Sequence, residues 1–149
     1  GIIGDGPERE NLQNLIIELG LESNVILLGS IESFETVYGI VKSSKLCALT
    51  THNGGGGNLT LLEAYGCGLP VVAFRLEEGI DENLILDGKS GLFVNDVTAE
   101  ALSKTLFTIL SNNDLLAQMR VGAVRFAKSL TWEASAVQYK EVILSKREI

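Results

Sequence analysis

Residues 46–63 read LCALTTHNGGGGNLTLLE, and this stretch decides the fold. The apolar run at 46–49 predicts a short buried strand, and residues 60–67 predict the helix that follows it. Four consecutive glycines, at 54–57, lie between the two, where a backbone without Cβ atoms can approach a ligand closely. A strand, a glycine loop and a helix in this order predict an α/β unit with a ligand-binding loop at the carboxyl end of the strand.

The rest of the chain alternates short apolar runs with amphipathic stretches, which predicts a Rossmann-like α/β fold. We expect one parallel sheet of about five strands with helices on both faces, a helical C-terminus, and a single domain over residues 1–149. Glycine or proline stands at the ends of the early helices. The last three helices are expected to begin at Thr98, at Asn113 or Asp114, and at Thr131. Trp132 and Tyr139 are expected to pack within the final helix. The expected strands are 2–3, 25–28, 46–49, 71–74 and 92–94, and the expected earlier helices are 6–19, 34–41, 60–67 and 78–86.

The composition excludes several classes of function. A net charge of −7 and a pI near 4.7 argue against nucleic-acid binding, which requires clustered Lys and Arg. No apolar run is long enough to span a membrane. Cys47 and Cys67 are interpreted as buried reduced thiols, and the acidic residues from Glu77 to Glu82 as a solvated helix start. We therefore expect no metal site.

The glycine loop and the helix after it suggest a site for a nucleotide. Backbone N–H groups of residues 54–60 converge on the positive end of the helix, which is the arrangement of a diphosphate cradle. Glu63 lies one turn into the helix, and its two oxygens can accept hydrogen bonds from vicinal ribose hydroxyls. Each feature alone also fits a simpler interpretation, a loose surface loop and a Glu favoured by the helix dipole.

Four segments strengthen the nucleotide interpretation because they occur together in one order. They read GDGP at 4–7, NVILLG at 24–29, LEAYGCGLPVV at 62–72 and DGKSGLFV at 87–94. In this order they closely resemble the donor-binding, C-terminal half of the retaining GT-B glycosyltransferases called group 1, or family 4. The resemblance covers nearly the whole chain.

The resemblance implies a set of donor-binding positions. Glu63 matches the residue that binds the ribose hydroxyls, and Gly29 and Ser30 match a turn near the base. One family Glu, which hydrogen-bonds the donor sugar, is replaced here by Gly55, and Asn53 or Asn58 is a candidate to replace part of that contact. His52 and Glu82 are further candidates near the donor. The loop positions expected to contact the diphosphate and the sugar are Gly55, Gly56, Gly57, Asn58, Leu59 and Thr60.

The function implied is transfer of a sugar from a nucleoside-diphosphate sugar to a glycan or lipid-linked acceptor. No cofactor beyond this donor is expected. The resemblance places a first strand–helix unit and an acceptor-binding domain outside residues 1–149, so the chain alone is expected to be inactive. The expected location is the cytoplasm, with contact at the membrane surface through the acceptor domain left open.

Three alternatives remain at this point. Gly55 in place of Glu suits a degenerate, non-catalytic donor-binding module or a partner subunit. A GT-B epimerase would need acid and base groups, for which His52 is the obvious candidate here. A nicotinamide-dinucleotide domain is hinted at by Gly4 and Gly6, but Arg9 stands where its third glycine would be, and Ser30 stands where an acid should end the second strand.

Overall fold

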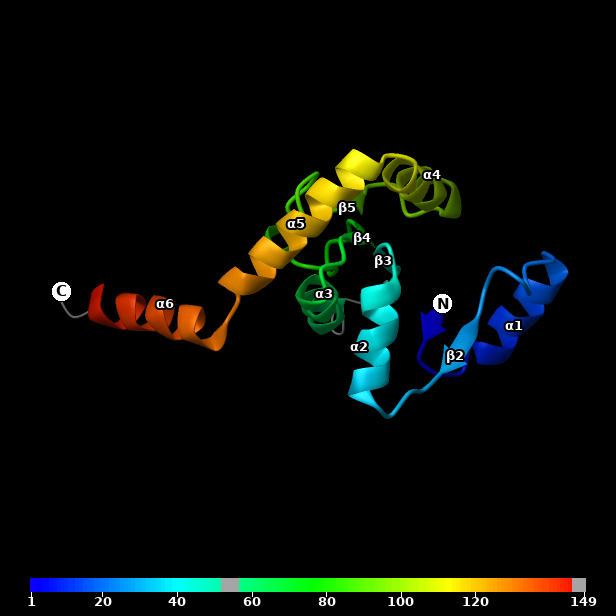
Figure 1. Ribbon diagram of the computed structural model, residues 1–149, viewed down its shortest axis with the longest axis horizontal. Helices are drawn as coiled ribbons and strands as arrows, with labels where there is room; N and C mark the ends of the chain where they lie inside the picture. The colour runs from blue at the N-terminus through cyan, green and yellow to red at the C-terminus, as the bar shows by residue number, and fades with distance from the viewer. Residues whose placement is uncertain (52–56, 146–149) are drawn as a thin grey trace. The chain divides into compact units, whose positions relative to one another are not determined.

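The computed structural model describes residues 1–51 and 57–145, and it consists of two compact units (Figure 1). The first unit is Gly1–Ile40 and the second is Val41–Ile149. Each unit contains its own parallel sheet. The α/β class and the five strands are confirmed, but the expected single sheet is corrected to a two-stranded and a three-stranded sheet.

The first unit is a β–α–β arrangement. Strand β1 (Ile2–Ile3) pairs in parallel with β2 (Leu27–Gly29), and helix α1 (Arg9–Glu18) connects them. Helix α2 (Phe34–Ser43) begins in this unit and ends in the second. Gly20 has a φ of 65°, which confirms the left-handed end predicted for α1. The helix starts at Arg9 rather than at Pro7, because residues 7 and 8 form a turn before it.

The second unit is built on three parallel strands in the order β3-β4-β5. These are β3 (Cys47–Leu49), β4 (Val71–Phe74) and β5 (Gly91–Val94). All four residues of β4 are buried, as expected for a central parallel strand covered on both faces. A Cβ added to Gly91 would lie 2.0 Å from the carbonyl oxygen of Val71, so only glycine fits beside β4 here.

Alternate residues of β4 face two different hydrophobic clusters. Val71 and Ala73 belong to a cluster with Leu61 and Tyr65 of helix α3 (Gly57–Gly66). Val72 and Phe74 belong to a second cluster with residues of helices α4 (Ala99–Leu110) and α5 (Asn113–Ser129), which are Ile109, Leu116 and Met119. The prediction of helices on both faces is therefore confirmed for the sheet of the second unit.

The N-terminal caps of the last three helices are confirmed by hydrogen bonds. Thr98 Oγ1 accepts from the N–H of Ala101 at 3.2 Å, and Thr131 Oγ1 accepts from Ala134 at 3.2 Å. Asn112, one residue before the predicted start, caps α5 through its side-chain oxygen. Helix α6 (Trp132–Ser145) has no buried residue, and Trp132 is 89% exposed. The expected packing of Trp132 and Tyr139 is therefore wrong.

The helix predicted at 78–86 is also wrong. Only the single 3₁₀ turn η1 (Glu82–Leu84) forms in this stretch. The Asp81 carboxylate accepts hydrogen bonds from the backbone N–H and the side-chain amide of Asn83, both at 2.9 Å. A side chain that binds its own neighbouring backbone competes with an α-helix, and here it produces the tighter turn. In the described part of the chain, no helix has the length and apolar character needed to cross a membrane.

Candidate functional site

The three strands of the second unit end at one edge of their sheet. The residue after β3 is Thr50, the residue after β4 is Arg75 and the residue after β5 is Asn95. Because the strands are parallel, these three residues follow the carboxyl ends, where open α/β sheets bind their ligands. In the sequence, the glycines at 54–57 come a few residues after Thr50.

Helix α3 begins at Gly57, at the far end of that loop. Its first turn carries no acidic side chain, so no carboxylate of the helix itself occupies its positive end. Leu59 is 67% exposed and Thr60 is exposed as well. The positions His52, Asn53, Gly55 and Gly56 lie outside the described residues, as do the side chains of Gly57 and Asn58.

Glu63 lies at the border of the buried face of α3. Its neighbours Leu61, Ala64 and Tyr65 are all within the core, whereas Glu63 is half-buried. A carboxylate in this position is held on a rigid helix and still reaches solvent.

The pKa of the Cys67 thiol, one turn after Glu63, shows which charges lie near this part of the helix. Burial raises the pKa of the Cys67 thiol, the nearby Lys42 ammonium lowers it, and the Glu63 carboxylate raises it. One cation and one anion therefore lie near the same thiol. Lys42 was not considered in the sequence analysis, because the 21 positions that separate it from Glu63 give no sign of proximity.

Arg75 organises the loops at the carboxyl edge. Its guanidinium donates to Glu82 Oε1 at 2.6 Å, to Asp87 Oδ2 at 3.1 Å and to Asn95 Oδ1 at 3.0 Å. The same group lies 4.4 Å from the centre of the Phe93 ring, within cation–π range. Glu82, a candidate for contacts with the donor, is thus held by an ion pair with Arg75. No pattern in the sequence pointed to Arg75, because its partners are 7 to 20 residues away.

The first unit has its own carboxyl edge, formed by the ends of β1 and β2. Gly29 ends β2 with a φ of 70°, and its carbonyl accepts from the N–H of Gly4 at 2.8 Å. Arg9 extends toward Gly29, since a Cβ added there would lie 3.4 Å from the Arg9 guanidinium. Ser30 follows and is exposed. Arg9, which the sequence analysis used only to argue against a dinucleotide fingerprint, thus brings a positive charge to Gly29.

The described residues contain two free thiols and no cluster of metal-binding side chains. Cys47 and Cys67 are free thiols, half-buried rather than fully buried, and burial raises the pKa of Cys47. Over residues 1–51 and 57–145, no three His, Cys, Asp or Glu side chains gather in a way that could hold a metal ion.

Comparison with known proteins identifies the family. The sequence model of "Glycosyl transferases group 1" matches residues 1–125, which cover the first unit and most of the second. The chain belongs to this family. Group 1 membership confirms the resemblance inferred from the four ordered segments.

Individual relatives agree with the family. An uncharacterized glycosyltransferase of Methanocaldococcus jannaschii is 30% identical over 95% of this chain and 35% of its own length. A GDP-mannose-dependent alpha-(1-6)-phosphatidylinositol monomannoside mannosyltransferase of Mycolicibacterium smegmatis is 27% identical over 99% of this chain and 40% of its own length. The chain therefore spans roughly a third to two fifths of these group 1 proteins.

A solved structure supports the fold. Sucrose-phosphate synthase from Thermosynechococcus elongatus superposes with a TM-score of 0.78 at 22% identity, over 98% of this chain and 38% of the other. This similarity confirms the Rossmann-like α/β fold.

Proposed function

We propose that this chain is the donor-binding part of a retaining glycosyltransferase, which transfers a sugar from a nucleoside-diphosphate sugar to a glycan or lipid-linked acceptor. The observation that carries the proposal is Glu63, held half-buried on α3 one to two turns after the helix begins at the carboxyl edge. Family membership over residues 1–125 supports the reaction class.

Glu63 is assigned to the ribose. Two carboxylate oxygens on a fixed helix match two vicinal hydroxyls, and hydrogen bonds to a charged group contribute about 1.5–3 kcal/mol each. The backbone N–H groups of Gly57, Asn58, Leu59 and Thr60 are unpaired within the helix by its geometry, and they are assigned to the diphosphate.

The remaining donor contacts are proposed on the resemblance to the family. Gly29 and Ser30 are assigned to the neighbourhood of the base, and the loop positions Gly55 and Gly56 to the diphosphate and sugar. His52, Asn53 and Glu82 remain candidates for contacts with the donor. The ion pair with Arg75 supports Glu82, because it fixes the direction of that carboxylate.

The wider assembly is also a proposal. Residues 1–149 are proposed to act as one donor-binding domain, because the family match covers the first unit and most of the second. The acceptor-binding domain and a first strand–helix unit would lie elsewhere in the whole protein. The mycolicibacterial relative is named for GDP-mannose and phosphatidylinositol monomannoside, which supports a lipid-linked acceptor for this chain. No metal or cofactor is proposed, so chelation by EDTA should leave donor binding unchanged.

A degenerate module is the second candidate, and Gly55 favours it. The family Glu at this position hydrogen-bonds the donor sugar, and its loss would cost roughly 10- to 150-fold if the bond acts in the transition state. A module of this kind would bind the nucleotide, and an attached sugar would not increase its affinity.

Calorimetric titration tests the proposal. The chain is titrated with UDP, GDP and ADP, and with their sugar conjugates, alongside Glu63→Ala and the control Glu141→Ala, which removes an exposed carboxylate from α6. We expect one nucleotide to bind, Glu63→Ala to weaken it by about 10- to 150-fold, and Glu141→Ala to leave it unchanged. Equal affinity of Glu63→Ala and the parent chain would refute the assigned role.

The sugar conjugates separate the two candidate functions. Tighter binding of the conjugate than of the nucleotide, lost in Asn53→Ala or Asn58→Ala, supports a transferase in which an amide replaces the missing Glu. If the parent chain, Asn53→Ala and Asn58→Ala each bind the nucleotide and its sugar conjugate with equal affinity, the degenerate module is supported.

A further inference from the structure

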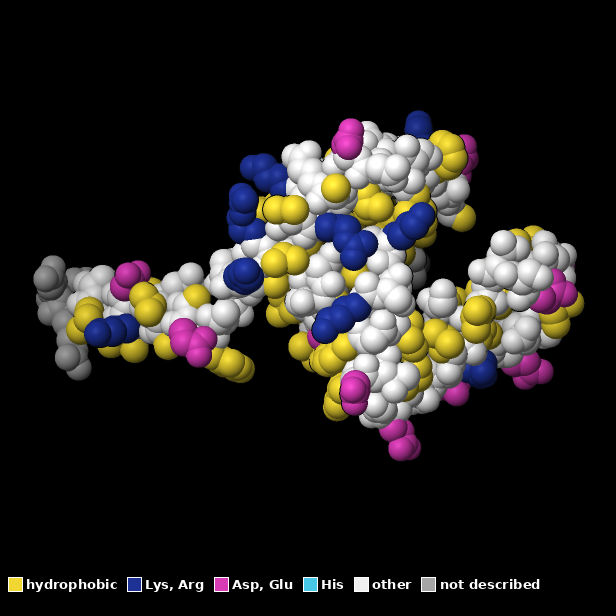
Figure 2. All heavy atoms as spheres, viewed as in Figure 1, with side chains coloured by type: hydrophobic (Ala, Val, Ile, Leu, Met, Phe, Trp, Pro, Cys, Tyr) yellow, Lys and Arg dark blue, Asp and Glu magenta, His cyan; other side chains and the backbone are white. Residues whose placement is uncertain are grey.

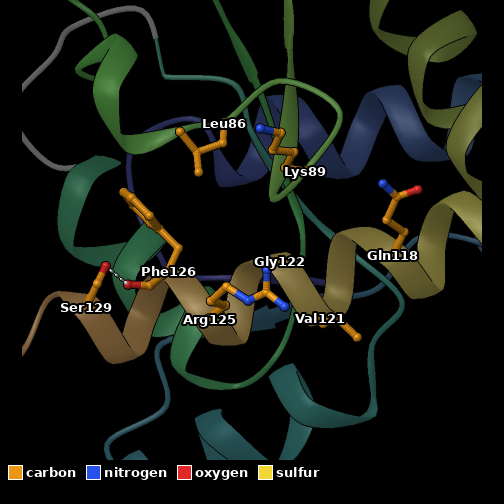
Figure 3. A pocket seen from close by; sticks show the side chains of 8 residues that line it. All are labelled: Leu86, Lys89, Gln118, Val121, Gly122, Arg125, Phe126 and Ser129. Atoms are coloured by element: carbon orange, nitrogen blue, oxygen red, sulfur yellow. Dashed lines mark hydrogen bonds between the residues drawn. The ribbon is translucent and has the colours of Figure 1, made fainter.

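A groove of about 680 Å³ lies between helix α5 and the turn that precedes β5 (Figure 3). The turn, residues 86–90, comes before the first residue of β5, so the groove is at the amino edge of the sheet. Asp87 in the same turn binds Arg75 at 3.1 Å, so the turn also contacts the network at the carboxyl edge. None of the residues that line the groove is among the proposed donor-binding residues. Its lining residues are Leu86, Lys89, Gln118, Val121, Gly122, Arg125, Phe126 and Ser129.

The groove is preformed, because its two walls are locked together. A Cβ added to Gly122 of α5 would lie 1.9 Å from the carbonyl oxygen of Lys89, so the turn rests directly on the helix backbone. The turn itself is closed by Ser90, whose Oγ accepts from the N–H of Leu86 at 3.0 Å. The same buried Oγ is 2.9 Å from the hydroxyl of Tyr65. A site with fixed walls avoids much of the ordering cost of binding.

The lining combines apolar side chains with unpaired cations. Leu86 and Val121 are 41% and 60% exposed, and Phe126 packs edge-to-face on Tyr65 behind them. Lys89 comes from the turn and Arg125 from the helix, so the two walls each contribute one positive charge (Figure 3). In the described part of the chain neither makes an ion pair, and no acidic residue lines the groove.

The charge around the groove is opposite in sign to that of the whole chain. Helix α5 carries Arg120, Arg125 and Lys128 against one acid, Asp114, whereas the chain as a whole has a net charge of −7. Figure 2 shows Lys and Arg side chains beside hydrophobic ones over this helix. Asp87 is the one acid of the turn, and its carboxylate is paired with Arg75 at 3.1 Å rather than with Lys89 or Arg125. Charges at physiological ionic strength act over about 8–10 Å, so an anion in the groove is attracted mainly by these cations.

We propose that this groove docks the chain on a membrane by holding the headgroup of an anionic phospholipid. The phosphate is placed between Lys89 and Arg125, and the glycerol and upper acyl region lie against Leu86 and Val121. A free phosphate would not use the apolar wall, and an uncharged apolar partner would leave two cations buried against it, so a phosphate joined to an apolar chain fits the lining best. The proposal does not depend on Glu63 or on a bound nucleotide.

Sedimentation with lipid vesicles tests this proposal. The 149-residue chain is mixed with vesicles of phosphatidylcholine and with vesicles that contain roughly 30% phosphatidylglycerol. We expect binding to the anionic vesicles alone. Lys89→Ala with Arg125→Ala should reduce the partition coefficient by about 25-fold, the product of about fivefold for each cation.

Matched variants isolate the groove from general electrostatics. Lys45→Ala with Lys104→Ala removes two exposed cations of the same unit that do not line the groove, and it should leave binding unchanged. Lys89→Arg with Arg125→Lys keeps both positive charges, so this variant should bind the vesicles as well as the parent chain does. Val121→Ser should weaken it by about threefold without changing the charge. Circular dichroism of each variant confirms that it remains folded.

Several outcomes would overturn the proposal. No binding to anionic vesicles at low salt would do so, as would an equal loss in the Lys45/Lys104 variant. Displacement of the chain from vesicles by millimolar glycerol phosphate would show a site for a soluble phosphate instead. Concentration-dependent self-association in ultracentrifugation, abolished by the Lys89/Arg125 variant, would assign the groove to a second copy of the chain. Since Glu63→Ala should leave vesicle binding unchanged, failure here is distinct from failure of the proposed function.

Discussion

In the second unit all four residues of β4 are buried, whereas both residues of β1 in the first unit are exposed. Ile2 and Ile3 are 43% and 37% exposed, and Ile16 is the one buried hydrophobic residue among the described residues of the first unit. A two-stranded sheet with one covering helix cannot enclose its apolar side chains, whereas three strands with helices on both faces can. The comparison shows that the second unit supplies most of the buried apolar surface.

The largest expected effect comes from removing a core side chain in each unit. Leu61→Ala in α3, where the side chain is fully buried, should lower the free energy of unfolding by about 2–5 kcal/mol. Leu15→Ala in α1, where the side chain is 48% exposed, should cost less than about 1 kcal/mol. Amide hydrogen exchange measures the protection of the backbone amides in each unit separately. Comparable losses of protection from the two changes would contradict the comparison.

A smaller effect is expected from the buried polar pair of the second unit. Burial raises the pKa of Tyr65 to about 12 from its usual 10, and the hydrogen bond with Ser90 partly offsets this. The unfolded chain loses the phenol proton first, so stability present below pH 10 is lost as the pH rises toward 12. The loss should reach about 2–3 kcal/mol.

Urea unfolding near pH 9 and near pH 11 measures this dependence. Tyr65→Phe should be less stable at the lower pH by about 1 kcal/mol and should lack most of the alkaline loss. If Tyr65→Phe loses as much stability as the parent chain between these two values, the alkaline sensitivity belongs to other groups.

The smallest effect is expected at the exposed carboxyl edge. Arg75→Gln should cost only about 1 kcal/mol, because Glu82 and Asp87 are more than half exposed and their ion pairs are screened by solvent. This cost should decrease as salt is added. Asp87→Asn should lower the free energy of unfolding less in the Arg75→Gln variant than in the parent chain. Additive, salt-independent effects would mean that Arg75 acts through packing on Phe93 rather than through its charge.

The sequence predicted the local elements well and the long-range contacts poorly. Residues 71–74 were predicted as a strand without error, because four apolar residues between Pro70 and Arg75 leave little alternative. The turn at Gly20 and the caps at Thr98 and Thr131 followed from single residue types with specific backbone roles.

The errors share a physical cause, which is competition from interactions that spacing does not reveal. The helix expected at 78–86 was replaced because Asp81 binds its own backbone neighbourhood. The division into two sheets, the exposure of Trp132 and the contacts of Arg75 and Ser90 depend on residues far apart in the chain. Of the candidate site, Glu63 and its helix were predicted, whereas Lys42, Arg9 and Arg75 emerged only from the structure.

The most direct test of the account is to map the nucleotide that binds by calorimetry onto the amide NMR spectrum of the chain. The account predicts shifts at Leu59, Thr60 and Glu63 on α3 and at Thr50 and Arg75 on the carboxyl edge. Lys89 and Arg125 in the groove at the amino edge should not change. Shifts confined to the groove residues, with α3 unaffected, would contradict the assignment of the donor site.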